Sequence, residues 1–211
     1  MDKHLARLFE KYPDLEGLEG DLTAAFELLR DCFAAGGKAL FCGNGGSAAD
    51  SEHVVGELMK GYLRPRPVPE DVRQRLQEAF PEEGAYLADN LQGALPSISL
   101  VSQTALLTAF ANDVEPQMIF AQQVYGYGKP GDVVVGISTS GNSGNVLHAM
   151  RVARAMGLRT LGFTGEGGGK LTALCDVAVR VPWQATADIQ ERHLATYHAL
   201  CGMLEDVFFG D

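Results

Sequence analysis

Four hydroxyl side chains follow a run of valines and a glycine in the stretch VVVGISTSGNS, residues 133–143. They are Ser138, Thr139, Ser140 and Ser143, and a helical pattern begins directly after them. One hydroxyl is enough to cap the N-terminus of a helix, so a cap alone does not explain four of them. Hydroxyl groups and glycine at a helix N-terminus are typical of a site for an anion such as a phosphate.

A second loop of this kind, CGNGGSAAD at residues 42–50, also follows a short apolar run and precedes a helical pattern. Neither loop contains the GxxxxGK[ST] motif of a P-loop, and the glycine spacing of the second differs from GxGxxG. In open α/β sheets, ligands bind beyond the carboxyl ends of the strands. We therefore expect both loops at the ligand-binding edge of a sheet.

His53 and Glu57 lie four residues apart on the helix predicted after this second loop, so they share one face of that helix. Such a pair can bind a metal ion, act as an acid and a base, or form an ordinary surface pair. Its place one helical segment beyond a candidate ligand loop favours a functional role. The C-terminal helix carries Gln190, His193 and His198, although a lone histidine there is more often packed or exposed than catalytic.

The elements that must position these residues alternate along the chain. Apolar runs predict strands in the first part of KALFCGNGGS (38–47) and at 96–101, 132–138, 159–165 and 177–182. Helical patterns lie between them, and a long helix is predicted at 187–208. Strands separated by helices in this way predict βαβ units, and so a three-layer α/β fold around a mainly parallel sheet.

We expect a single domain over residues 1–211, which begins with two helices in residues 1–35. Residues 63–83 differ in character, because they combine prolines with a charged helical pattern. Such a stretch is typical of an insertion rather than of the core. We expect an insertion over residues 63–93 that forms a lid, alters the substrate length or makes a subunit contact.

The composition excludes some classes of protein. A formal net charge of −10 argues against non-specific nucleic-acid binding, which needs a basic face. No stretch approaches the ~18 apolar residues of a membrane-spanning helix, and the N-terminal residues lack the apolar core of a signal peptide. The four cysteines are scattered and form no CxxC pair, which is typical of reduced thiols in a cytoplasmic protein.

Taken together, CGNGGS and STSGNS resemble the loops of the sugar isomerase (SIS) domain family, which binds phosphosugars on a flavodoxin-like sheet. The chain more closely resembles the phosphoheptose isomerases through CGNGGSAADSEHVVGEL, AND (111–113), GDVVVGISTSGNSGNV, TGEGGGKL and IQERHLATYH, all in family order. The resemblance implies a cytosolic enzyme that converts sedoheptulose 7-phosphate to D-glycero-D-manno-heptose 7-phosphate for activated-heptose biosynthesis. It also implies a homotetramer with its sites at subunit interfaces.

The resemblance assigns roles to individual residues. It implies one Zn²⁺ per site, with His53, Glu57, Gln190 and His198 as ligands. An aldose–ketose isomerase moves a proton between two carbons through an enediol(ate), and Glu57 matches the base at carbon with His198 as the acid/base. The sequence leaves open which of these two takes the proton from carbon. The implied substrate-binding residues are Asn44, Gly45, Ser47, Glu57, Asp113, Ser138, Thr139, Ser140, Ser143 and Gln190.

Helix geometry separates two of the implied ligands. Gln190 and His198 are ~12 Å apart along a straight helix at 1.5 Å per residue. Either long side chains converge, the helix starts after Gln190, or one ligand comes from another subunit.

The chain also departs from the family pattern in three places, one of which is the longer insertion at 63–93. It has Lys60, Gly61 and Tyr62 where an arginine commonly follows the glutamate, and Asp188 where a basic residue is common. These departures keep a different phosphosugar isomerase as an alternative.

A non-catalytic SIS adaptor that binds a replication initiator protein is a further alternative. Retention of His53, Glu57, Gln190 and His198 argues against it, since an adaptor needs none of the four. A sugar-phosphate-sensing regulator would carry a DNA-binding domain, for which the 35 residues before the first strand are too short and too acidic.

Overall fold

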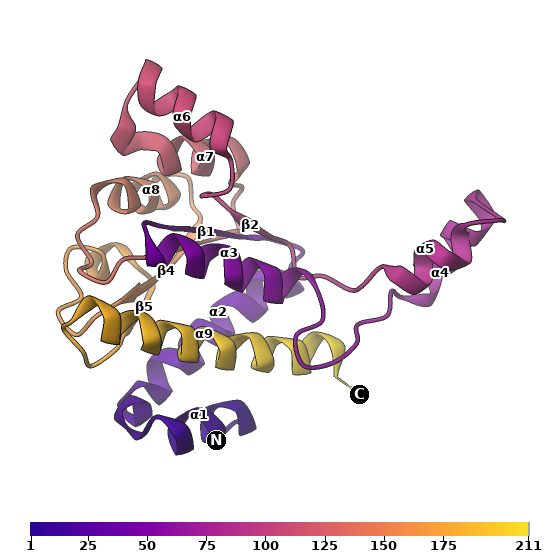
Figure 1. Ribbon diagram of the computed structural model, residues 1–211, viewed down its shortest axis with the longest axis horizontal. Coiled ribbons are helices and arrows are strands. Elements are labelled where there is room, and N and C mark those ends of the chain that lie inside the picture. Colours follow the sequence, from indigo (N-terminus) through magenta and orange to yellow (C-terminus); the bar gives the residue numbers. More distant parts are fainter. Residues whose placement is uncertain (211) are drawn as a thin grey trace.

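Five parallel strands form one sheet in the order β2-β1-β3-β4-β5 (Figure 1). The computed structural model describes residues 1–210. Strands β1 and β3 are buried along their whole length, because helices cover both faces of a parallel sheet. This strand order is the flavodoxin-like one, so the predicted α/β fold is confirmed. The strands are β1 (Ala39–Gly43), β2 (Ser97–Ser99), β3 (Val133–Ile137), β4 (Arg159–Thr164) and β5 (Val177–Arg180).

Alternate side chains of the central strands supply two apolar cores, one on each face of the sheet. Phe41 of β1 joins the core beneath α1 (Lys3–Lys11), α2 (Glu19–Ala34), α3 (Gly46–Met59) and α9 (Thr186–Phe209). Leu40 and Cys42 join the core beneath α7 (Ile119–Tyr127) and α8 (Gly144–Ala155). The result is the predicted αβα arrangement, with α6 (Thr104–Asp113) packed outside α7. Short 3₁₀ turns occupy Pro13–Leu18, Pro116–Met118 and Thr172–Leu174.

The loops after β1 and β3 lie side by side, because these two strands are neighbours in the sheet. The chain leaves β1 through α3 on one face and leaves β3 through α8 on the other, which makes this the switch point of the fold. The side chains of Asn44 and Asn145 join the two loops by a reciprocal pair of hydrogen bonds, each 2.9 Å long. The two glycine-rich loops therefore share the edge of the sheet predicted for them.

Helices α3 and α9 pack against each other and run in the same direction. Gly46, at the start of α3, contacts the side chain of Gln190, near the start of α9. Two turns later His53 of α3 hydrogen-bonds Tyr197 of α9. Residues that are far apart in sequence thus meet in order along a single seam between these two helices.

Residues 67–92 form an arm that projects from the body (Figure 1). It contains α4 (Glu70–Ala79), which buries no residue, and α5 (Gly84–Asn90), and Arg73 joins the two through a 2.6 Å ion pair with Asp89. A bridge between Pro67 and Gln92 closes its base. The segment 63–93, for which the sequence predicts an insertion, thus contains a helical hairpin that leads away from the body of the chain. No helix in residues 1–210 has the length and apolarity needed to cross a membrane.

Candidate functional site

The serine-rich loop folds into a tight turn before α8. The hydroxyl oxygens of Ser138 and Ser143 lie 2.9 Å apart. Gly141 closes the turn at a φ of 64°, and a Cβ added there would collide with the carbonyl oxygen of Gly168. Ser143 occupies the N-cap position of α8, yet its side chain makes no capping hydrogen bond. A capping role for Ser143 is thus not realised, and in the first turn of α8 it is Asn145 Oδ1 that accepts from a backbone N–H, that of Val146.

The N-terminus of α3 likewise lacks a side-chain cap. Gly45 is its N-cap residue, with a φ of 56° that favours glycine, and it has no side chain to cap the helix. Neither α3 nor α8 carries an acidic residue in its first turn. The positive ends of two helices therefore meet at the switch point, and this arrangement suits a phosphate.

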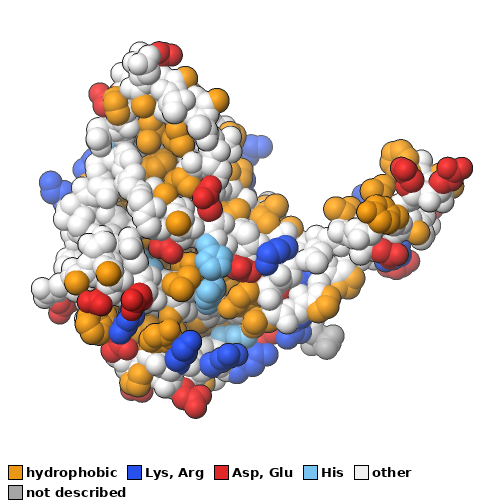
Figure 2. Space-filling view, viewed as in Figure 1, with side chains coloured by type: hydrophobic (Ala, Val, Ile, Leu, Met, Phe, Trp, Pro, Cys, Tyr) orange, Lys and Arg blue, Asp and Glu red, His pale blue; other side chains and the backbone are white. Residues whose placement is uncertain are grey.

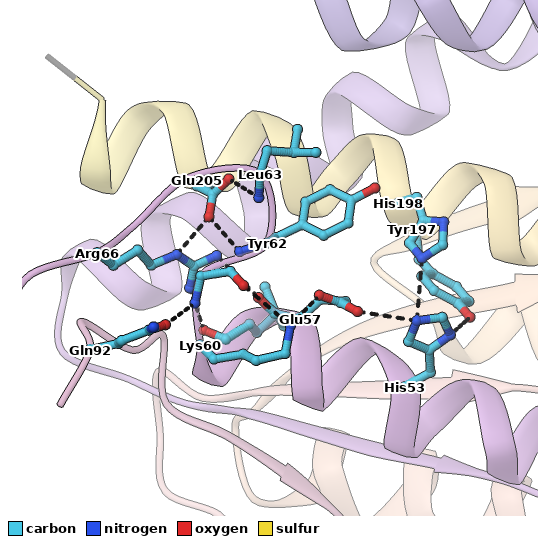
Figure 3. Close-up of polar contacts among 12 residues, drawn as sticks. His53, Glu57, Lys60, Tyr62, Leu63, Arg66, Gln92, Tyr197, His198 and Glu205 are labelled. Carbon is cyan, nitrogen blue, oxygen red and sulfur yellow. Dashed lines mark hydrogen bonds and ion pairs between the residues drawn. The ribbon is translucent and has the colours of Figure 1, made fainter. Parts of the chain in front are cut away.

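Two turns along α3, three side chains converge (Figure 3). His53 Nε2 lies 3.2 Å from Glu57 Oε1 and 3.4 Å from His198 Nε2. One potential ligand atom from each of the three residues falls within 4.8 Å of the others. Lone pairs brought this close repel one another unless a cation or a proton lies between them, so this donor set fits a metal ion. Figure 2 shows histidine side chains near the middle of this face, beside acidic and basic ones.

Neighbouring groups set the electrostatics of this triad. The ammonium of Lys60 contacts Glu57 Oε2 at 2.9 Å, on the side away from His53. Burial lowers the pKa of His198, and His53 lowers it further, while Glu57 acts in the opposite direction. His198 is consequently neutral at pH 7, with one nitrogen able to donate a proton and the other able to accept one.

An open groove of about 420 Å³ adjoins the triad. Tyr62 and His198 line one side of it, and their rings stack at a centroid distance of 5.5 Å. Helix α1 lines the other side with Leu8 and the basic residues Arg7 and Lys11. His198 therefore borders a space large enough for a small ligand to enter.

Other predicted site residues lie apart from the triad. The Gln190 side chain packs against Gly46, and an added Cβ at Gly46 would collide with the Gln190 amide. Helical rise explains this position, since Gln190 precedes His198 by ~12 Å along α9. Asp113 ends α6, is exposed, and accepts a hydrogen bond from Asn112. Ligation by Gln190 and substrate contact by Asp113 remain predictions.

Three residues that lie near the triad were not predicted from the sequence to have a role in the site. Tyr62 stacks on His198, and Arg66 donates to the carbonyl oxygens of Glu57 and Leu58 at the end of α3. Asp50 precedes His53 by one helical turn, and this spacing is a signal that identifies it from sequence. Arg66 had no such signal, because its contacts depend on how the chain folds back against the end of α3 and against α9.

Comparison with known proteins identifies the family of this chain. The sequence pattern of a SIS domain matches residues 73–165, which include the serine-rich loop. The phosphoheptose isomerase of Rhodospirillum rubrum is 41% identical over 200 residues, which is 95% of this chain and 89% of that protein. This chain belongs to the phosphoheptose isomerase family. The phosphoheptose isomerase of Akkermansia muciniphila is 37% identical and covers 95% of the chain and 93% of its own length.

Solved phosphoheptose isomerases share the fold. The structure from Neisseria gonorrhoeae has a TM-score of 0.74 at 33% identity and covers 96% of this chain and 95% of its own. That from Francisella tularensis has a TM-score of 0.76 at 28% identity, with 93% and 91% covered. The expected membership of the phosphoheptose isomerases, and with it the isomerase class, is confirmed.

Proposed function

We propose that the protein converts sedoheptulose 7-phosphate to D-glycero-D-manno-heptose 7-phosphate, a step in activated-heptose biosynthesis. The observation that carries the proposal is the His53–Glu57–His198 triad, two turns along α3 from a pair of uncapped helix N-termini. This layout offers a phosphate site and an acid–base site to the two ends of one molecule. The names of the curated relatives support the choice of a heptose phosphate.

In the proposed mechanism the phosphate is held first. Ser138, Thr139, Ser140 and Ser143 donate hydroxyl hydrogens to it, and the positive ends of α3 and α8 add a favourable potential. Asn44, Gly45 and Ser47 line the other loop of this site. Holding the remote phosphate orients the reacting carbons against α3 and so converts binding energy into rate.

Two side chains then move protons. The Glu57 carboxylate takes the proton from one of the two reacting carbons and returns it to the other. Neutral His198 donates a proton to one substrate oxygen and accepts one from its neighbour, so that the carbonyl and hydroxyl exchange places. Lys60 donates to the second oxygen of Glu57 and thereby holds the carboxylate in place.

The donor set of two imidazoles and a carboxylate fits Zn²⁺, and we assign His53, Glu57 and His198 as its ligands. Gln190 is the proposed fourth ligand, either through a shift of its side chain or from another subunit. A bound zinc ion would act as a Lewis acid that polarises the substrate carbonyl.

We propose that the protein is a homotetramer with its sites at subunit interfaces. Helix α6 supports this, because it buries no residue within the chain and ends beside Val114, which is 66% exposed. In the assembled tetramer we assign Asp113 to substrate binding. The four cysteines, all unpaired, are consistent with function in the cytoplasm, where thiols stay reduced.

An assay with purified protein tests the proposal. Incubation with sedoheptulose 7-phosphate and added Zn²⁺ should yield an aldose phosphate, detected by chromatography or by a coupled enzyme. Glu57→Gln and His198→Ala should each abolish turnover, because one removes the base and the other the acid. Ser102→Ala, which loses only a hydroxyl bonded to Glu52, is the control and should retain activity.

The absence of turnover with several ketose phosphates and several divalent metals would reject the enzyme assignment and favour the adaptor alternative. Turnover of a different ketose phosphate, with sedoheptulose 7-phosphate inert, would reject only the substrate.

A further inference from the structure

A chain of hydrogen bonds runs behind His53, on the side away from Glu57. The Tyr197 hydroxyl lies 3.0 Å from His53 Nδ1 and donates to Asp50 Oδ1 at 3.2 Å. Asp50 and His53 belong to α3, whereas Tyr197 reaches them from α9. Figure 3 shows the Tyr197 hydroxyl against the rear nitrogen of the His53 ring.

We propose that Tyr197 and Asp50 are positioning residues that fix the tautomer and the orientation of His53 for metal binding. The inference rests on the proposed metal site, and it concerns residues to which neither the family resemblance nor the comparisons assign a role.

The direction of the hydrogen bonds shows which nitrogen of His53 holds the proton. A carboxylate only accepts, so the Tyr197 hydroxyl gives its proton to Asp50. The phenolic oxygen is then left to accept a proton from His53 Nδ1. This places the imidazole proton on Nδ1 and the free lone pair on Nε2, which is the atom that faces Glu57 and His198. Metal-bound histidines are commonly oriented through their second nitrogen in this way.

The exposure of the His53 ring shows why it needs a partner to hold its orientation. The His53 side chain is 43% exposed, so packing alone holds it weakly, whereas Tyr197 is 3% exposed and rigidly placed. The edge of the Tyr197 ring meets the His53 ring at a centroid distance of 5.6 Å. Tyr197 therefore supplies both the contact and the hydrogen bond that select one rotamer of an otherwise mobile ligand.

Asp50 supplies the third observation. Its Oδ2 atom is buried and has no hydrogen-bond partner among residues 1–210. Burying an unpartnered polar oxygen costs stability, so the carboxylate is a poor choice for packing alone. Its other oxygen, Oδ1, accepts the hydrogen bond that orients the Tyr197 hydroxyl. The carboxylate therefore orients His53 through Tyr197, and this role offsets its cost in stability.

Metal affinity measured on the metal-free protein tests this inference without reference to turnover. Zn²⁺ is titrated against a chromophoric chelator of known affinity. Tyr197→Phe removes one oxygen and should weaken binding by about 10- to 100-fold, the usual effect of losing such a partner. Tyr62→Phe is the matched control, because its ring also touches a triad histidine but its hydroxyl bonds to none of the three. It should bind like the wild type.

Two substitutions of Asp50 distinguish the loss of a hydrogen-bond acceptor from the loss of a negative charge. Asp50→Asn keeps an oxygen that can accept from Tyr197, and should lose less affinity than Asp50→Leu. The double variant Tyr197→Phe with Asp50→Leu should bind no more weakly than Tyr197→Phe alone, since both act through one hydroxyl. Thermal unfolding of the metal-free variants checks that the fold is kept. If Asp50→Leu does not fold, Tyr197→Phe and Asp50→Asn decide the matter.

Two failures are distinguishable. Wild-type affinity in Tyr197→Phe, with zinc still bound by the triad, would overturn the positioning role and leave the proposed isomerase intact. A wild-type protein that binds neither Zn²⁺ nor another divalent metal would overturn the metal site itself, and the positioning role with it.

Discussion

His193 on α9 is a buried histidine whose titration should govern stability in mild acid. It is 0% exposed, its Nε2 lies 3.2 Å from the carbonyl oxygen of Thr164, and its Nδ1 is buried with no partner among residues 1–210. Burial lowers the pKa of His193 to about 4, although the bond to Thr164 acts in the opposite direction. The residue belongs to the core, and the site does not use it.

The direction of the change in stability follows from the protonation of His193 in the folded and the unfolded chain. Between pH 6.5 and about 4 the unfolded chain binds a proton at this residue and the folded chain does not. The free energy of unfolding therefore falls as the pH drops through this window, and it is unaffected above pH 7.5. At pH 5, which is 1.5 units below the unfolded pKa, the loss is about 2 kcal/mol at 1.36 kcal/mol per unit.

His193→Leu isolates this contribution. The variant leaves the Thr164 carbonyl oxygen with its other donor, the N–H of Val181 at 3.0 Å, and removes the unpartnered nitrogen. At pH 7.5 we expect its stability within ~1 kcal/mol of the wild type. At pH 5 the difference should shift by about 2 kcal/mol in favour of the variant. Urea denaturation at pH 5, 6 and 7.5 and one protein concentration measures it, and parallel pH profiles would refute the reasoning.

Further predictions concern the end of α3 and the proposed phosphate-binding loops. Arg66→Met leaves Glu205, which is 1% exposed, without its buried cation, and should destabilise the protein by about 3–5 kcal/mol in chemical denaturation. Adding Glu205→Gln should restore part of that loss, and no recovery would contradict a charge effect. Ser143→Ala should raise the KM for the sugar phosphate about tenfold or more, because it removes a hydrogen-bond donor to a charged group. The change in kcat should be smaller. An unchanged KM would place the phosphate elsewhere. Gly46→Ala should lower activity because its Cβ collides with the Gln190 amide, and wild-type activity there would exclude a role for that contact.

Much of the fold was predictable because local signals agree with one another. The valines of β3 are buried on both sides, so an uninterrupted apolar run marks a central parallel strand. The glycine-rich loops lie beyond β1 and β3, where the rule for open sheets places ligands. His53 and Glu57 are brought together by a single helix, so their spacing alone predicts the contact.

The remaining features depend on packing between distant segments. The contact between His198 and His53 requires α9 to run parallel to α3, and spacing within one helix carries no information about that. The residue pattern alone makes Arg66, in a proline-rich stretch, an exposed loop residue. It is instead 1% exposed, because Glu205 accepts from it at 2.8 Å across 139 residues of chain. The arm shows the same limit, since composition identifies a hairpin but not the direction in which it projects.

The first two turns of α3 set a fixed distance between the two parts of the proposed site. From Gly46 at the proposed phosphate end to His53 at the proposed reacting end the helix rises ~10 Å at 1.5 Å per residue, and its backbone hydrogen bonds make this length rigid. A ketose phosphate of five carbons would be anchored by the same loops but would leave its carbonyl short of Glu57. Such sugars would occupy the site as inhibitors rather than substrates, and chain length would be selected by the rate of the reaction more than by affinity.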